Sequence, residues 1–396
     1  MTDQLIHHRL NANTRRGSAI VQVTVSSTVL LGFVALAVDV GHMYAARAEM
    51  QSAVDAAALA GTGVLLTDER LKGAYELESV IASARSAASE YAALNTVVGR
   101  HLEIDLNEGN SPNGGIVVGF LDDPRDRGAP LDLNNPFRFN SVYVRMVHDE
   151  DENGPLDLGF ARIFGYDAAN VAVQAMATAQ DGVGGYRMPD TGEQPNVLPF
   201  ALQYDVWLNL LATGPVEGQD NYSYDAATGE VSSGADWLPE LNLYPGAGSD
   251  QLPPGNFGTV DIGSPNNSTR DIARQILNGI SAEDLAWFEN SELKLGSDGT
   301  LQLNGDTGLS AGIKDELAAI IGQPRAIPLF TVVSGPGNNA QFTIVGFAGV
   351  RIMDVKLTGA MSQKRVIIQP AVLADRAAIG GGGNSFFVYR PVALCR

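Results

Sequence analysis

The uncharged stretch from Gly17 to Val38 most constrains what this chain can fold into. Its first half, GSAIVQVTVSST, is mildly polar, its second half, VLLGFVALAV, is strongly apolar, and Asp39 is the first charge after it. About 20 such residues form a helix about 30 Å long, which matches the hydrocarbon core of a bilayer. Hydroxyl side chains in the stretch can hydrogen-bond to helix carbonyls and so can lie in lipid. The sequence therefore predicts a transmembrane helix over residues 17–40.

The charges on either side of this stretch predict its orientation. Arg15 and Arg16 lie directly before it, and Asp39 follows it. Because positive residues favour the cytoplasmic side, residues 1–16 are expected to be a cytoplasmic basic tail. Everything after Asp39 is then extracytoplasmic. The expected location is the cytoplasmic membrane, crossed once, with the N-terminus inside and the ectodomain in the periplasm or outside the cell.

Two other interpretations of the same stretch remain open. The tripeptide Ala-Leu-Ala at residues 35–37 has the small-residue pattern of a signal-peptide cleavage site after an apolar run. Cleavage after Ala37 would release a secreted adhesin or matrix protein. A buried helix of a soluble protein is the second alternative, which the length and the flanking charges disfavour.

An alanine-rich segment follows, and it predicts a helix over residues 41–65. Small and apolar side chains recur along one side of this helix, at Met43, Ala46, Met50, Ala53, Val54, Ala57 and Gly61. Such small side chains allow another helix to approach closely. The stripe could therefore bind a partner or pack on the chain's own ectodomain, and the second interpretation is slightly favoured.

These N-terminal residues resemble the TadE/TadG-like proteins of the Flp pilus (tight-adherence) assembly system. The resemblance covers Arg16 to about Thr62: Arg16-Gly17 before the apolar run, LAVDVGHMY across its end, and RAEMQSAVDAAALAG after it. It continues more weakly to about residue 180, where DLGFARIFGYDAANVAVQAMATA resembles the closing strands of the family's extracytoplasmic part. The resemblance implies a single-pass envelope protein that supports pilus assembly or surface adhesion.

One departure from the family bears on the kind of protein expected. Some relatives are processed like prepilins, after a glycine that is followed at the fifth position by glutamate. Here Gly17 would be that glycine, and the fifth residue after it is Gln22. The resemblance then implies an anchored assembly or surface protein rather than a pilus subunit. Its expected partners are the lipid bilayer and other envelope or pilus-assembly proteins.

Composition excludes several classes of function. The formal net charge is −19, and −21 resides outside the first 16 residues, so the acidic ectodomain is not expected to bind nucleic acid. A single cysteine, Cys395, rules out an intrachain disulfide or a CxxC zinc site. No histidine follows His148, which excludes a histidine-based hydrolase or zinc site within the C-terminal half. A non-catalytic protein without a cofactor is expected; a hydrolase with an unrecognised carboxylate site in that half is the alternative.

The expected fold class is α+β. The N-terminal transmembrane helix and the alanine-rich helix precede a first α/β extracytoplasmic region at 66–180, a linker at 181–196 and a β-rich C-terminal domain at 197–396. In the first region we expect a helix over 68–95 and the strands HLEIDL, GGIVVGFL, NSVYVRMV, FARIF and NVAVQAMATA.

Local signals in the C-terminal domain predict helix starts and strands. Ser268 or Thr269 is expected to cap one helix, and Ser281 with Asp284 to form a capping box on the next. The sequence LKLGSDGTLQLNG is expected to be a hairpin around its Asp-Gly turn. The apolar run at 366–368 suits a central strand.

An acidic loop gives a weak calcium candidate. Asp149, Asp151 and Asn153 match the first half of a calcium-loop pattern, but the twelfth position is Phe160, where the pattern needs glutamate. A turn with solvated charges is the favoured interpretation, and no metal site is expected.

Overall fold

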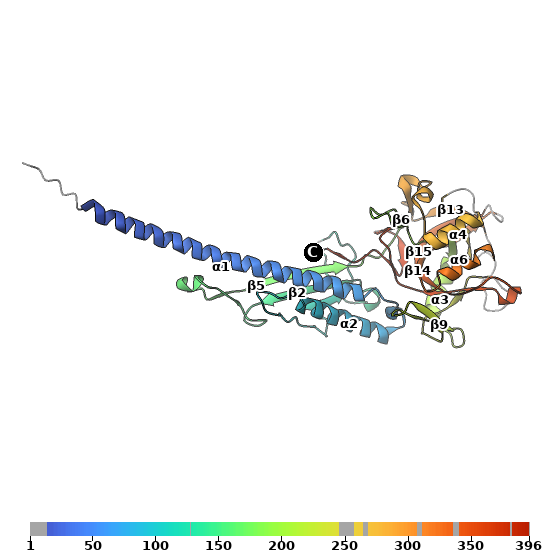
Figure 1. Cartoon of the computed structure of the whole chain (residues 1–396). Helices are drawn as coiled ribbons and strands as arrows, with labels where there is room; N and C mark the ends of the chain where they lie inside the picture. The colour runs from blue at the N-terminus through green and yellow to red at the C-terminus, as the bar shows by residue number, and fades with distance from the viewer. Residues whose placement is uncertain are drawn as a thin grey trace, which may run out of the picture.

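The computed structural model describes residues 14–126, 128–244, 257–263, 268–306, 311–335, 340–380 and 382–395. Helix α1, Thr14–Val64, extends far beyond the rest of the molecule at its N-terminal end, and two sheet-containing regions follow one another along its other end (Figure 1). The α+β fold class, with an apolar N-terminal helix and a sheet-rich C-terminal region, is confirmed.

Helix α1 has two halves with opposite environments. From residue 19 to Val40 its apolar side chains are exposed, Leu31 at 68% and Phe33 at 66% among them. From Ala46 onwards one side of the same helix is fully buried. The helix continues through Gly41, because a single glycine weakens a helix by only about 1 kcal/mol.

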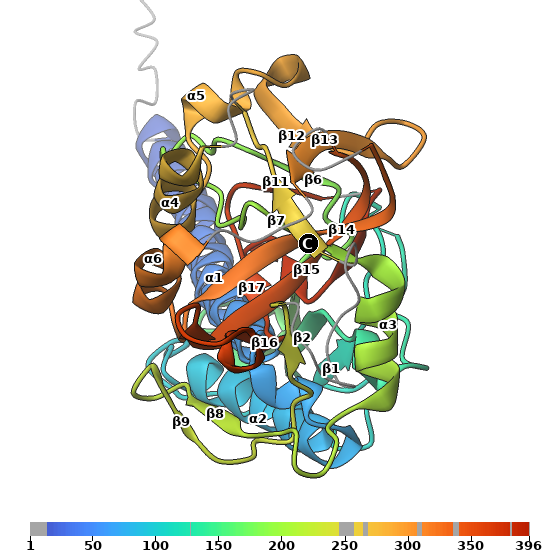
Figure 2. The ribbon, with the colours of Figure 1, turned by 90° about the vertical axis from the view of Figure 1, so that its right-hand side faces the viewer.

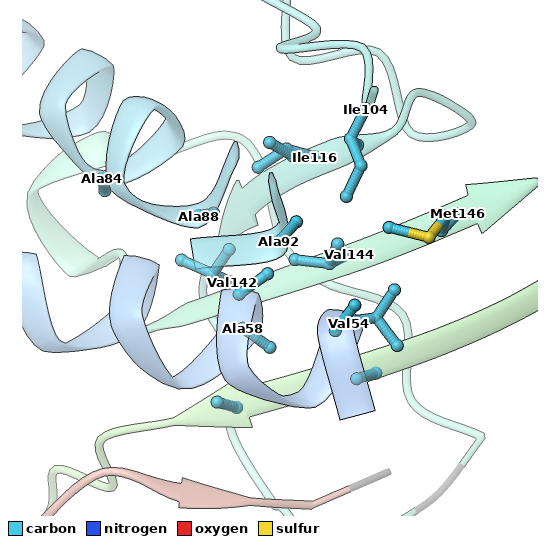
Figure 3. Packing of buried hydrophobic residues seen from close by; sticks show 14 of the residues in the cluster. Val54, Ala58, Ala84, Ala88, Ala92, Ile104, Ile116, Val142, Val144 and Met146 are labelled. Atoms are coloured by element: carbon cyan, nitrogen blue, oxygen red, sulfur yellow. The ribbon is translucent and has the colours of Figure 1, made fainter. Parts of the chain in front are cut away.

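The buried half of α1 packs in the first region against helix α2 and an antiparallel sheet. Helix α2 is Ala74–Ala93, and the sheet has the order β1-β2-β5-β21. The strands are β1 (Ile116–Gly119), β2 (Ser141–His148), β5 (Val171–Thr178) and β21 (Ala393–Leu394). Figure 3 shows Val54 and Ala58 of α1, Ala88 and Ala92 of α2, and Val142 of β2 meeting in this core.

Three expectations for the first region were wrong. The helix over 68–95 is interrupted at Gly73, which has a φ of +115°, so a short 3-10 helix, η1 (Asp68–Leu71), precedes α2. The segment HLEIDL has no strand pairing. The segment FARIF, predicted as a strand, contains the 3-10 helix η3, Ala161–Phe164. It is the tip of a hairpin-like loop between the short paired strands β3 (Leu156–Asp157) and β4 (Ala168–Ala169).

The second region is built on an eight-stranded sheet of order β10-β16-β15-β13-β11-β7-β14, with β19 paired to β15. Figure 2 views this region along α1. The strands are β7 (Phe200–Gln203), β10 (Leu241–Asn242), β11 (Phe257–Val260), β13 (Leu301–Asp306), β14 (Pro324–Ser334), β15 (Ala340–Lys356), β16 (Arg365–Pro370) and β19 (Asn384–Phe386). The apolar run 366–368 lies in β16, between β10 and β15, as expected of a strand with neighbours on both sides.

Helices and smaller sheets complete the second region. The helices are α3 (Tyr204–Thr213), α4 (Thr269–Asn278), α5 (Ala282–Leu285) and α6 (Lys314–Ala319). Its short 3-10 helices are η4 (Glu289–Ser291), η5 (Ala311–Ile313) and η7 (Met361–Gln363). A further 3-10 helix, η2 (Pro136–Arg138), belongs to the first region. The remaining strands are β6 (Gly185–Arg187), β8 (Tyr222–Asp225), β9 (Glu230–Ser233), β12 (Glu292–Lys294), β17 (Leu373–Ala374), β18 (Ala378–Ile379) and β20 (Val388–Tyr389).

The predicted helix caps are confirmed, whereas the predicted hairpin is wrong. Ser268 caps α4, and Ser281 and Asp284 form the capping box of α5. The strands on either side of the Asp-Gly turn do not pair with each other: β12 pairs with β6, and β13 pairs with β11 and β15. The turn is present, with Gly299 at a φ of +76°, but each strand finds a longer-range partner.

Two features of the chain join the regions. Residues 181–196, expected as a linker, contribute strand β6 to a small sheet with β12 and β18 of the second region. At the other end of the chain, β21 returns to the first region and pairs with β5. The first sheet is therefore completed by the C-terminus.

Candidate functional site

The exposed half of α1 is the first element of the candidate site. It is long and apolar enough to cross a membrane, and none of its most apolar window is buried. Such continuous exposure distinguishes it from the core helix of a soluble protein. The backbone of Arg15 and Arg16 begins this helix, but their side chains lie outside the described residues.

Asp39 lies where the exposed half of α1 ends, and it is only 4% exposed. Its Oδ1 accepts hydrogen bonds from the backbone N–H groups of Gly159 (2.9 Å) and Phe160 (3.2 Å). Its Oδ2 accepts from Phe160 (2.9 Å) and Ala161 (2.6 Å). One carboxylate thus binds three consecutive amides about 120 residues further along the chain.

These amides need an outside acceptor because they begin helix η3. The residue at the N-cap of η3 is Phe160, whose side chain cannot accept a hydrogen bond. The first N–H groups of a helix have no partner inside it, and a carboxylate caps them through charge-assisted hydrogen bonds. Asp39 is therefore the cap of η3, supplied by a different helix. Gly159 allows this approach, since a Cβ there would lie 3.3 Å from Oδ1 of Asp39.

The small-residue stripe of α1 lies against the chain's own first region. Ala46, Met50, Ala53, Val54 and Ala57 are fully buried, and Met43 is partly buried at the edge of the same cluster. Neighbouring elements are α2, β2 and β5. The surface that the stripe forms in this structure is internal.

The two regions meet around Asp68 and Arg351, a pair of opposite charges that the sequence separates by 283 residues. Arg351 is 4% exposed, forms a salt bridge with Asp68, and lies over the ring of Tyr224 with its guanidinium carbon 3.4 Å from the centroid. The other oxygen of Asp68 accepts from the N–H of Val372 at 2.6 Å. This contact fixes the second region to the start of η1, directly after α1.

Arg70 strengthens the same contact between the first and second regions. It is 4% exposed and donates to the carbonyls of Leu65 (2.9 Å), Phe137 (3.1 Å) and Phe139 (2.8 Å). Its guanidinium carbon lies 5.7 Å from the ring centroid of Tyr389 in the second region. A buried cation with three hydrogen bonds to backbone carbonyls holds the elements around it together.

The weak calcium candidate is a self-contained turn. Oδ1 of Asp149 accepts from the N–H groups of Asp151 and Glu152, each at 2.9 Å. The side chain of Asn153 bonds to the backbone of Glu103 and to the Val147 carbonyl. Among the residues that the structure describes, no group of three or more His, Cys, Asp or Glu side chains is arranged to hold a metal ion.

Carboxylates of the second region line a surface cavity of about 910 Å³ between η4, β12 and the loop before β13. Glu292 lies within ion-pair distance of two cations, 3.7 Å from Arg187 and 3.8 Å from Lys294. Asp298 accepts from the N–H and hydroxyl of Thr300 within its turn. These partners are those of structural carboxylates.

One further carboxylate is perturbed. Burial raises the pKa of Asp261 to about 6, and the charges of Asp271 and Asp284 act in the same direction. Arg274 binds Asp284 at 2.7 Å. Within the part of the chain that the structure describes, no cation forms a salt bridge with Asp261. Asp261 follows β11, at the edge where α4 and α5 begin.

The sequence predicts Asp39 as part of this site, but it predicts neither the partners of Asp39 nor the Asp68–Arg351 pair. The sequence predicts Asp39 as the outer boundary of the membrane stretch, but it does not indicate the partners at 159–161, because FARIF has the pattern of a strand. The Asp68–Arg351 pair carries no sequence signal at all, since a separation of 283 residues follows no local pattern.

Within the residues that the structure describes, one helix is long and apolar enough to cross a membrane, and it continues without a break into two packed α+β regions. Residues 17–74 match the family model of putative Flp pilus-assembly TadE/G-like proteins, which confirms the resemblance seen from Arg16 to about Thr62. The matched segment ends at the first residue of α2. No curated protein and no solved structure matches the chain.

Proposed function

We propose that this protein is a single-pass membrane protein of the cell envelope whose ectodomain supports Flp-type (Tad) pilus assembly or surface adhesion. It acts by position and contact, with other envelope or pilus-assembly proteins as partners and without catalysis. The proposed topology has Arg15 and Arg16 in the cytoplasm and everything after Asp39 outside. The TadE/G-like match at residues 17–74 supports the family context.

The continuity of α1 is the observation that carries this proposal. A flexible tether would break the helix after the membrane stretch, whereas α1 runs on for 24 residues beyond Val40 and is buried from Ala46. The ectodomain is therefore held at a fixed orientation to the exposed half of α1, and the Asp68–Arg351 contact extends this rigidity to the second region. Such an arrangement suits a protein that presents a surface at a defined height above a membrane.

The test compares an anchored with a released ectodomain. Cells that lack the protein would be complemented with the full chain, or with a chain whose residues 1–37 are replaced by a cleavable export signal. The proposal expects surface pili and attachment to return only with the full chain. Equal complementation by the released ectodomain would favour the secreted adhesin.

We also propose that no cofactor is needed. Calorimetric titration of the full chain with calcium is expected to give no binding heat, because Asp149 and Asn153 already use their side chains in the turn. Saturable heat that is lost in Asp151→Asn would contradict this.

A further inference from the structure

We propose that the loop at residues 160–166 inserts its apolar side chains into the interfacial layer of the bilayer that α1 crosses, as a second contact with lipid. The inference rests on the proposed membrane anchor. It adds an attachment that holds the ectodomain against the membrane surface.

The loop exposes a run of large apolar side chains. Ile163 is 79% exposed, Tyr166 68%, Phe164 65% and Phe160 44%. Four such side chains within seven residues form an exposed apolar patch of the kind that marks a contact surface. They surround one turn of 3-10 helix at the tip of the β3–β4 hairpin, so they point outward from a narrow support.

The backbone of the loop is already hydrogen-bonded within the protein. Asp39 binds the N–H groups of residues 159–161, and the N–H groups of Gly165 and Tyr166 donate to the carbonyls of Arg162 (3.0 Å) and Ala161 (3.1 Å). Gly165 closes the turn with a φ of +85°. Backbone that satisfies itself in this way can enter a region poor in water, whereas an open loop cannot.

The position of the loop indicates that lipid is the partner of its exposed apolar side chains. Because Asp39 binds the loop directly, the loop lies at the level where the exposed apolar surface of α1 ends. The exposed surface of α1 extends to the contact between Asp39 and the loop, through Leu36 (50% exposed), Val38 (52%) and Val40 (41%). Figure 1 shows the loop as the green turn at the end of the ectodomain from which the bare half of α1 emerges. The two apolar surfaces therefore lie on either side of the Asp39 contact.

The composition of the loop suits the interfacial layer. Aromatic side chains are enriched at the level of lipid headgroups. Arg162 lies 3.3 Å from Asp157, with both side chains more than half exposed, so its guanidinium is free to exchange this weak pair for a lipid phosphate. Since the ectodomain is acidic, the contact depends on apolar burial, and salt should change it little.

The experiment places one fluorophore at a time on the full chain. Starting from Cys395→Ser, single cysteines are introduced as Phe164→Cys, Val29→Cys or Tyr75→Cys and labelled with the environment-sensitive dye NBD. The proteins are reconstituted in vesicles of phosphatidylcholine with some phosphatidylglycerol. The emission wavelength of the dye, its quenching by aqueous iodide and its quenching by nitroxide-labelled lipid are then compared between the three positions. Val29 reports the anchor, and Tyr75, which is 81% exposed on α2, reports the water-exposed ectodomain.

The inference predicts that the dye at residue 164 is blue-shifted relative to residue 75, is quenched by lipid nitroxide placed near the headgroup, and is shielded from iodide. A dye at residue 164 that behaves like residue 75, while residue 29 lies in lipid, overturns the loop contact and leaves the anchor intact. If residue 29 is also exposed to iodide, the anchor itself fails. A signal at residue 164 that rises with the protein-to-lipid ratio would assign the patch to a second copy of the chain and would overturn the inference.

Discussion

Replacing Gly61 by alanine tests how closely α1 and α2 approach each other. A Cβ at Gly61 would lie 2.9 Å from the carbonyl oxygen of Ala84, 3.1 Å from Cβ of Ala88 and 3.2 Å from Val142. Two of these neighbours belong to α2, so the helices must separate or shift. Overpacking of this kind costs about 1–3 kcal/mol. The gain in helix propensity, at most about 1 kcal/mol, offsets only part of it.

Gly63 supplies a matched control in the same helix. A Cβ there meets nothing within 4 Å, so Gly63→Ala gains propensity without a clash. We expect the two variants to differ by about 2 kcal/mol in the free energy that holds α2 on α1, which is roughly thirtyfold in the opening equilibrium.

Hydrogen exchange of α2 peptides, measured by mass spectrometry on the full chain in nanodiscs, checks this difference. Gly61→Ala should exchange faster than the unmodified protein, and Gly63→Ala as slowly or more slowly. Equal exchange in the two variants, or slower exchange in Gly61→Ala, would refute the close packing of the two helices.

Three further substitutions test other parts of the structure. Asp39→Ala should speed hydrogen exchange at residues 159–161 by about fivefold and leave β15 unchanged, because three amides lose their acceptor. Unchanged exchange at these amides would show that the cap is unimportant. Asp68→Asn leaves the buried Arg351 without its counter-charge, so the free energy of unfolding should fall by roughly 3 kcal/mol in chemical denaturation. Since burial raises the pKa of Asp261 to about 6, the folded state holds this proton more tightly than the unfolded state, and stability falls as pH rises from the ordinary pKa towards 6. Asp261→Asn should therefore stabilise the protein at pH 7.5, by about 1 kcal/mol after allowance for solvent screening, and give no gain near pH 3.5; a gain that is independent of pH would contradict the shift.

The parts of the structure that the sequence predicts are those determined locally. The membrane-length stretch, the continuation of α1 and the caps at Ser268 and Ser281 depend on residues within a few turns of one another. The TadE/G-like module is local in the same sense, because its signature lies within α1. Pattern and spacing are sufficient for such features.

The parts that the sequence misses depend on distant partners. FARIF has an apolar pattern compatible with a strand, and it forms a 3-10 turn with Asp39 from another helix as its cap. Likewise, β12 and β13 are adjacent in sequence and pair with β6 and β15 instead of each other. Here tertiary pairing overrides the local hairpin signal, because strand pairing depends on the surrounding sheet more than on the turn alone.

The central claim is that α1 remains intact as an anchor continuous with the ectodomain. The most direct measurement is the N-terminal sequence and intact mass of the protein recovered from carbonate-washed membranes, together with protease digestion of intact spheroplasts. The account predicts a membrane-bound chain that retains residues 1–37, with an ectodomain that is digested from outside. A soluble protein whose first residue is Val38 would contradict it.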